Sequence, residues 1–188
     1  MDTYDAIMNR HSVRAYTTEA VDRDVLERML RAAMAAPSAM NAQPWYFYVA
    51  TGATRELIGA AMAQSTVHLK DYMDVLPPER IVAAERFYAS LGGAPVVVAL
   101  SIPSSDDGMD RTYNQVAAGC AIENLLLAAR AEGLSSCHLT VPLWVMDGMR
   151  RILSVPEGRE LISLIIVGYP AEAPLAPEHS FNHVTYFE

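Results

Sequence analysis

Residues 114–132 restrict the fold more than any other part of the sequence. They have the spacing of a helix that Gly133 stops, and apolar residues recur on nearly every face of that helix. These apolar positions are Val116, Ala117, Cys120, Ala121, Ile122, Leu125, Leu126, Leu127 and Ala128. Such a helix is predicted to be buried all round, either because a second subunit covers its exposed side in a two-fold dimer or because other elements of the same chain enclose it. The pattern alone leaves both arrangements open.

The length and composition of the chain predict one globular domain. A chain of 188 residues can bury roughly 70% of the surface of its unfolded state. Hydrophobic residues make up 52% and charged residues 19%, which excludes a disordered or fibrous protein. We therefore assign residues 1–188 to a single domain, in which residues 64–93 are expected to form a lid-like excursion and residues 170–188 a carboxyl-terminal extension.

The charge of the chain argues against nucleic acid as a partner. The formal net charge is −8 and no basic cluster relieves it, so a phosphate polymer would be repelled. The amino terminus lacks a signal-peptide pattern and no stretch approaches the ~20 apolar residues that span a bilayer, so we expect a cytoplasmic protein without a membrane partner.

Cys120 and Cys137 are expected to be small core residues. His179 and His183 lie four residues apart, but no further ligand pattern accompanies them and no metal is expected.

One helix and three strands can be predicted around the central helical segment. Asp22 is placed to cap a helix that Pro37 ends. Its apolar positions, which follow the helical repeat, are Val25, Leu26, Met29, Leu30 and Ala33. Residues 46–49, 96–100 and 161–167 are short, rich in β-formers and bounded by turn residues, and the last two are predicted to be central strands.

Residues 10–14 carry the first candidate site. In an extended segment alternate side chains share a face, so Arg10, Ser12 and Arg14 are predicted to point the same way. Two guanidinium groups and a hydroxyl arranged like this can hold a phosphate through charge-assisted hydrogen bonds. The alternative is an ordinary solvated surface, which most strings of this kind form.

Residues 36–45 carry the second candidate site. Pro37 and Pro44 fix the backbone on either side of a small polar loop between a helix and a strand, so its amides are held in one arrangement. A rigid polar loop of this kind suits recognition of a heteroaromatic ring edge. A well-made connecting turn without a ligand is the alternative.

Taken in order along the chain, these motifs resemble the flavin-dependent nitroreductase family. The matching stretches are Arg10-His11-Ser12-Val13-Arg14, Ala36-Pro37-Ser38 with Asn41, Gln43, Pro44 and Trp45, Ala94-Pro95-Val96-Val97-Val98, Gly133-Leu134-Ser135-Ser136-Cys137 and Ile165-Ile166-Val167-Gly168-Tyr169-Pro170. The resemblance implies an α+β fold with a central, mostly antiparallel sheet flanked by helices. It also implies an intertwined homodimer with two FMN sites in its interface.

The resemblance further implies which residues bind the cofactor. The positions of Arg10, His11, Ser12 and Arg14 match the motif that holds the FMN phosphate and ribityl end. The positions that match the loop approaching the flavin from the other subunit are Pro37, Ser38, Ala39, Asn41 and Gln43. Thr140 and Val141 match the segment whose backbone lies beside the flavin ring, and Arg86 is a candidate for its pyrimidine end, although it can equally be a solvated helix charge.

Two positions depart from the family pattern. The family commonly has Glu-Gly or Gly-Gly where this chain has Thr140 and Val141, so a plain loop is the alternative there. The family often places Lys or Arg near the carboxyl end to close on the phosphate, and this chain has residues 178–183 without either. The phosphate is therefore expected to depend more heavily on Arg10 and Arg14.

The resemblance implies an enzyme in which FMN itself carries the chemistry, with no catalytic side chain. No Rossmann motif is present, so NADH or NADPH is expected to bind transiently and leave after giving its hydride, in ping-pong turnover. The electrons would pass to a small acceptor such as a nitroaromatic or a quinone. The alternatives on the same fold are a flavin-fragmenting enzyme and a flavin-binding or storage protein without its own acceptor.

Overall fold

The structure is a computed structural model, which describes residues 1–67, 77–141, 143–173, 180 and 182–187. Its strands are β1 (Tyr46–Ala50), β2 (Val96–Pro103), β3 (Ser135–Leu139) and β4 (Arg159–Gly168). Its helices are α1 (Thr3–Asn9), α2 (Arg23–Met34), α3 (Gly52–Gln64), α5 (Pro78–Ser90), α6 (Gly108–Ala131) and α7 (Met146–Ile152), with short 3-10 turns η1 (Ala39–Asn41), η2 (Leu91–Gly93) and η3 (Leu143–Val145).

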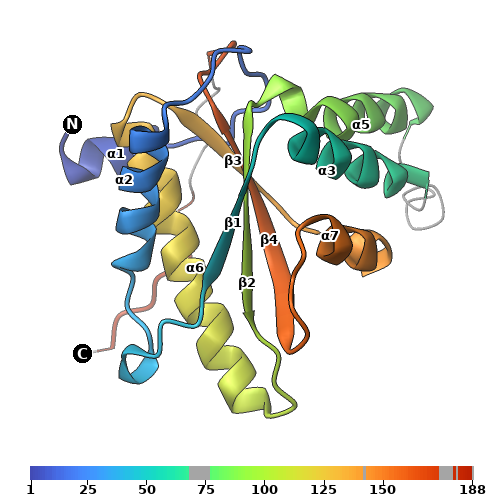
Figure 1. The fold of residues 1–188 in the computed structure, drawn as a ribbon. Helices are drawn as coiled ribbons and strands as arrows, with labels where there is room; N and C mark the ends of the chain where they lie inside the picture. Colours follow the sequence, from blue (N-terminus) through green and yellow to red (C-terminus); the bar gives the residue numbers. More distant parts are fainter. Residues whose placement is uncertain (68–76, 142, 174–179, 181, 188) are drawn as a thin grey trace.

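The four strands form one sheet in the order β1-β2-β4-β3, with every neighbouring pair antiparallel (Figure 1). The central strands β2 and β4 are those predicted to be central, because their continuous apolar runs suit burial on both faces. Val98 and Ile165 join the core beneath α2 and α6, whereas Val97 and Ile166 join the core beneath α3, α5 and α7. The predicted α+β fold with an antiparallel sheet between helices is therefore confirmed.

The predictions for individual helices and strands are confirmed only in part. Helix α2 occupies the predicted range and buries Leu26, Met29 and Ala33, but the side chain of Asp22 makes no capping hydrogen bond. Strand β3 was not predicted, because only Cys137 and Leu139 in it are apolar. Within the predicted excursion of residues 64–93, residues 78–90 form α5, a regular helix packed against α3, and residues 68–76 lie outside the described residues.

Helix α6 is longer than predicted, and the described part of the chain does not enclose it. It begins at Gly108, where the Asp107 carboxylate accepts hydrogen bonds from two backbone amides of the first turn. Along one side it packs on the sheet and α2, but Tyr113 is 49% and Val116 62% exposed on the other. The arrangement in which the same chain encloses the helix is therefore wrong for the described residues, and burial beneath a second subunit stays a prediction.

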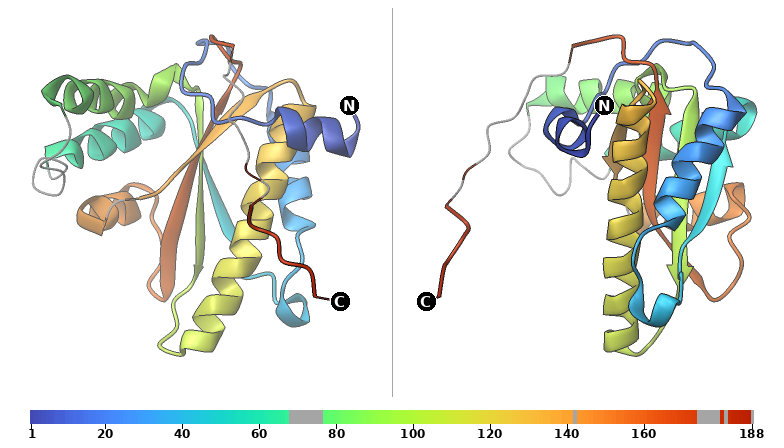
Figure 2. Two further views of the ribbon diagram at one scale, coloured as in Figure 1. Left: turned by 180° about the vertical axis from the view of Figure 1, so that it is seen from behind. Right: turned by 90° about the vertical axis from the view of Figure 1, so that its left-hand side faces the viewer.

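The carboxyl-terminal residues lie apart from the core. Residues 182–187 are exposed and stand off from the body of the molecule in Figure 2. His179, one of the two histidines weighed for a metal, lies outside the described residues. Among the helices that the structure describes, none is long and apolar enough to span a bilayer.

The segment after α1 is fixed by three parts of the fold. The amide of Val13 donates to the carbonyl of Ser136 on β3 at 3.2 Å, and the amide of Tyr16 donates to the carbonyl of Gly92 at 2.8 Å. Gly92 has φ +63°, and a Cβ there would overlap the carbonyl oxygen of Arg14. Only glycine allows both this conformation and this approach, so Gly92 sets the path of the segment.

Gly92→Ala is expected to destabilise the fold by about 1–3 kcal/mol, because the added methyl group meets left-handed backbone and a neighbouring carbonyl. Gly148→Ala in α7 is the matched control, since nothing lies within 4 Å of a Cβ there. That control should stabilise the protein by roughly 0.5–1 kcal/mol, as alanine does in a helix. Denaturant unfolding measures both, and equal stability of the two variants would contradict this account of Gly92.

Candidate functional site

Three side chains of the segment after α1 act on one buried thiol. Cys137 on β3 is 1% exposed, and this burial raises the pKa of its thiol. The guanidinium of Arg14, a hydrogen bond with the Ser12 hydroxyl and the guanidinium of Arg10 all act in the opposite direction. Arg10, Ser12 and Arg14 therefore act on the same thiol, and the bridge between Ser12 and Ser136 holds their segment beside β3.

Two carboxylates border this group. Nε of Arg10 lies 3.2 Å from Oε1 of Glu123 on α6, and the two side chains are 29% and 49% exposed. The main-chain amide of Arg14 donates to Oε1 of Glu172 at 3.0 Å. Partial burial lowers the pKa of His138, the residue after Cys137, and the Glu123 carboxylate opposes this shift. The group is cationic at its centre and acidic at its margins.

His11 lines a small cavity of about 40 Å³ together with Arg10 and with Leu126 and Arg130 of α6. Its Nδ1 is buried without a hydrogen-bond partner among the described residues. Arg10 and His11 thus both lie near α6, while Ser12 lies beside β3 through its bridge to Ser136.

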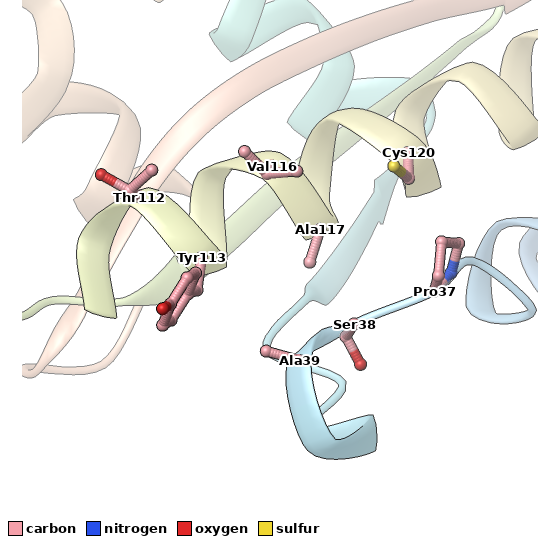
Figure 3. Close-up of a pocket in the computed structure, with 8 residues that line it drawn as sticks. All are labelled: Pro37, Ser38, Ala39, Thr112, Tyr113, Val116, Ala117 and Cys120. Atoms are coloured by element: carbon pink, nitrogen blue, oxygen red, sulfur yellow. The ribbon is translucent and has the colours of Figure 1, made fainter. Parts of the chain in front are cut away.

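The second candidate loop forms a separate groove. Pro37, Ser38 and Ala39 line a cavity of about 440 Å³ whose other wall is the uncovered side of α6 (Figure 3). The residues of that wall are Thr112, Tyr113, Val116, Ala117 and Cys120. Cys120 is therefore half-buried at a groove rather than in the core, whereas Cys137 is buried as predicted.

The loop beside this groove is held in an unusual conformation. Met40, Asn41 and Gln43 have φ values of 50°, 55° and 46°, in the left-handed region that side chains rarely adopt. The Ser38 hydroxyl accepts a hydrogen bond from the amide of Gln43 at 3.0 Å, which ties the loop to itself. Backbone strain of this kind is typical of functional sites, and the rigidity predicted from the two prolines agrees with it.

One chain does not bring the two candidate sites together. The segment after α1 reaches the amino-terminal end of β3 near the top of Figure 1, whereas η1 lies at the bottom. They also contact different stretches of α6, a helix of 24 residues or about 36 Å.

The remaining predicted residues lie at the other edges of the fold. Arg86 is exposed on α5, on the opposite side of the sheet from α6. Thr140 is exposed just beyond β3, and Val141 is buried in the core beneath α7, so only main-chain atoms of Val141 can face a ligand. Thr140 follows Ser136 by four residues, a span of about 13 Å along the edge strand.

Sequence reasoning missed Glu123 and the α6 residues of the groove. Glu123 is the only acidic residue between Asp110 and Glu132, and a lone carboxylate in an otherwise apolar helix is a usable signal. Thr112 and Tyr113 precede the predicted start of the helix, so their place on its uncovered side could not be derived.

The chain matches known proteins over most of its length. The model of the nitroreductase family matches residues 7–169. A putative NADH dehydrogenase/NAD(P)H nitroreductase of Methanothermobacter thermautotrophicus is 32% identical over 93% of this chain and 80% of the relative. Nitroreductase NfnB of Mycolicibacterium smegmatis is 28% identical over 87% of this chain and 80% of its own length.

Solved structures share the fold. A mutant of the FMN and NADPH-dependent nitroreductase NfnB from Sphigopyxis sp. strain HMH superposes with a TM-score of 0.81 at 25% identity, over 100% of this chain and 99% of that one. A BluB-like flavoprotein from Clostridium difficile gives a TM-score of 0.81 at 23% identity, over the whole of both chains. The fold and these similarities define an α+β oxidoreductase. The chain belongs to the nitroreductase family, which confirms the resemblance predicted from its motifs.

Proposed function

We propose that this chain is an FMN-dependent NAD(P)H oxidoreductase that reduces small acceptors such as nitroaromatics or quinones. The observation that carries this proposal is the placement of residues 10–14 along the edge strand β3, where Ser12 pairs with Ser136 beside Cys137, so that Arg10, Ser12 and Arg14 would form a phosphate-binding group there. The names of the relatives support it, because they describe NAD(P)H nitroreductases and an FMN and NADPH-dependent nitroreductase.

The donor set fits the phosphate of FMN. Guanidinium groups bind phosphate oxygens in pairs, and the Ser12 hydroxyl adds a third kind of donor. Burial raises the pKa of Cys137, so its thiol stays neutral at neutral pH and does not repel the phosphate. Arg10, Ser12 and Arg14 would therefore hold the phosphate, while His11 would support the segment from behind.

The ring end of the cofactor would lie further along the same edge strand. Thr140 and Val141 would offer main-chain N–H groups there, which favour negative charge on the ring. When bound, the flavin supplies the hydride-transfer chemistry. Arg86 would offer a cation toward the pyrimidine end. Because none of these groups is a general acid, protons would come from water.

The loop of residues 37–43 would complete the site from a second subunit. Pro37, Ser38, Ala39, Asn41 and Gln43 lie away from the phosphate-binding group of their own chain, beside the uncovered side of α6. A second copy packed on this side would cover Tyr113 and Val116 and bring its own loop to the flavin. We propose an intertwined homodimer with two sites on this basis.

Val116→Glu is expected to dissociate the dimer and release FMN, because it places a charge in the centre of the proposed interface. Leu57→Glu on α3 is the matched control, since Val116 is 62% and Leu57 57% exposed in one chain and Leu57 lies on the other side of the sheet. Sedimentation velocity and the flavin absorbance of the sedimenting species report both effects. A Val116→Glu protein that remains a dimer with its flavin would contradict the interface.

The purified protein should carry flavin absorbance bands close to one FMN per subunit. It should oxidise NADPH or NADH slowly in air and many times faster when a quinone or nitroaromatic is added, because the acceptor removes the electrons in the second half of a ping-pong cycle. A flavin-fragmenting enzyme or a storage protein would show no such dependence on acceptor. Colourless protein that takes up no FMN would reject the proposal altogether.

Arg10→Ala or Arg14→Ala is expected to weaken FMN binding by about ten- to a hundredfold, because each removes a charge-assisted contact of about 1.5–3 kcal/mol. The upper part of this range is expected, since no Lys or Arg occurs in residues 170–188. Arg23→Ala on α2, a residue that is 89% exposed, is the control. Titration of the apoprotein by flavin fluorescence measures affinity, and two arginine variants with unchanged affinity would discard the phosphate assignment.

A further inference from the structure

We propose that Glu123 is a positioning residue that orients the Arg10 guanidinium toward the FMN phosphate. The inference rests on the proposed function, in which Arg10 contacts the phosphate. Glu123 lies on α6, a rigid helix that packs on the sheet, while Arg10 belongs to an irregular segment. The ion pair between them therefore links a side chain of the proposed binding group to a regular helix.

The geometry of the pair leaves Arg10 able to bind. Its closest approach is between Nε and Oε1 at 3.2 Å, on the inner edge of the guanidinium. The end that carries the two Nη groups remains for a ligand, because a guanidinium has five donors in one plane. The pair of Arg28 and Glu132 shows the contrasting case, in which one carboxylate takes both Nε and Nη2 at 2.8 and 2.7 Å.

Glu123 has two opposing effects on phosphate binding, because it orients Arg10 but also repels the phosphate. The negative charge of Glu123 repels a phosphate, but its side chain is 49% exposed and water screens that repulsion. A free arginine side chain loses much rotamer freedom when it binds, and a partner that already holds it removes most of this cost. Because the pair engages Nε and leaves the Nη end, we infer that orientation outweighs repulsion.

The two possibilities predict different orders of affinity. If Glu123 orients Arg10, then Glu123→Ala and Glu123→Gln should both weaken FMN binding about three- to tenfold, because the contact is an ion pair at 3.2 Å and each variant removes the charge that holds the guanidinium. If Glu123 only competed with the phosphate, both variants would bind FMN more tightly than the wild type.

The experiment is a titration of the apoproteins with FMN and with riboflavin, followed by the loss of flavin fluorescence at pH 8. At this pH His138 is neutral, because partial burial holds its pKa below the ordinary value. Glu27→Ala and Glu27→Gln are matched controls, since Glu27 is 48% exposed and its Oε1 lies 3.1 Å from Nε of Arg23. The controls should not change affinity. Riboflavin lacks the phosphate, so its affinity should not change in the Glu123 variants.

The outcomes separate this inference from the proposed function. Glu123→Ala that binds FMN as tightly as the wild type, or that weakens FMN and riboflavin equally, would overturn the positioning role. When Glu123→Ala is added to Arg10→Ala, it should cause no further loss of FMN affinity, because Glu123 acts through Arg10. If Arg10→Ala itself leaves FMN affinity unchanged, the phosphate assignment fails, whatever the Glu123 variants show. Equal denaturant midpoints of the variants exclude a folding effect.

Discussion

The packing of one side of α6 on the sheet is the interaction on which the rest of the structure depends. Small and branched residues such as Ala118, Ala121 and Leu125 are fully buried there, so the helix lies close to the strands. With this side fixed, the opposite side is left to form the groove with Pro37, and Glu123 is held beside the segment after α1. Core packing, the proposed interface and the candidate site thus share one helix.

The candidate site is built mainly from irregular segments whose paths the regular elements impose. Residues 10–16 are held by the edge strand β3 and by Gly92, so three polar side chains act on the thiol of Cys137 although none belongs to a strand or helix. The loop of residues 37–43 is held by its own hydrogen bonds and strained backbone. This arrangement is common in enzymes, where a rigid scaffold presents loops that carry the chemistry.

The sequence predicts those features that depend on local patterns. The strands β2 and β4 are long apolar runs, and the alternation of residues 10–14 needs only an extended backbone. Strand β3 could not be predicted because it has too few apolar residues. The true start of α6 could not be predicted because the first turns of this helix are polar. The pairing of Arg10 with Glu123 joins residues far apart in the chain, and no local pattern encodes it.

The charges around the proposed phosphate site show why orientation has to contribute to binding. Arg10 and Arg14 are bordered by Glu123 and Glu172, so the formal charge of this group is close to zero. The chain as a whole carries −8, but salt screens charges that lie more than about 10 Å away. Net charge therefore does not attract the phosphate. Donors that are already oriented toward it would bind without first losing side-chain freedom, so the proposed phosphate site would depend mainly on the geometry that α6 and β3 impose.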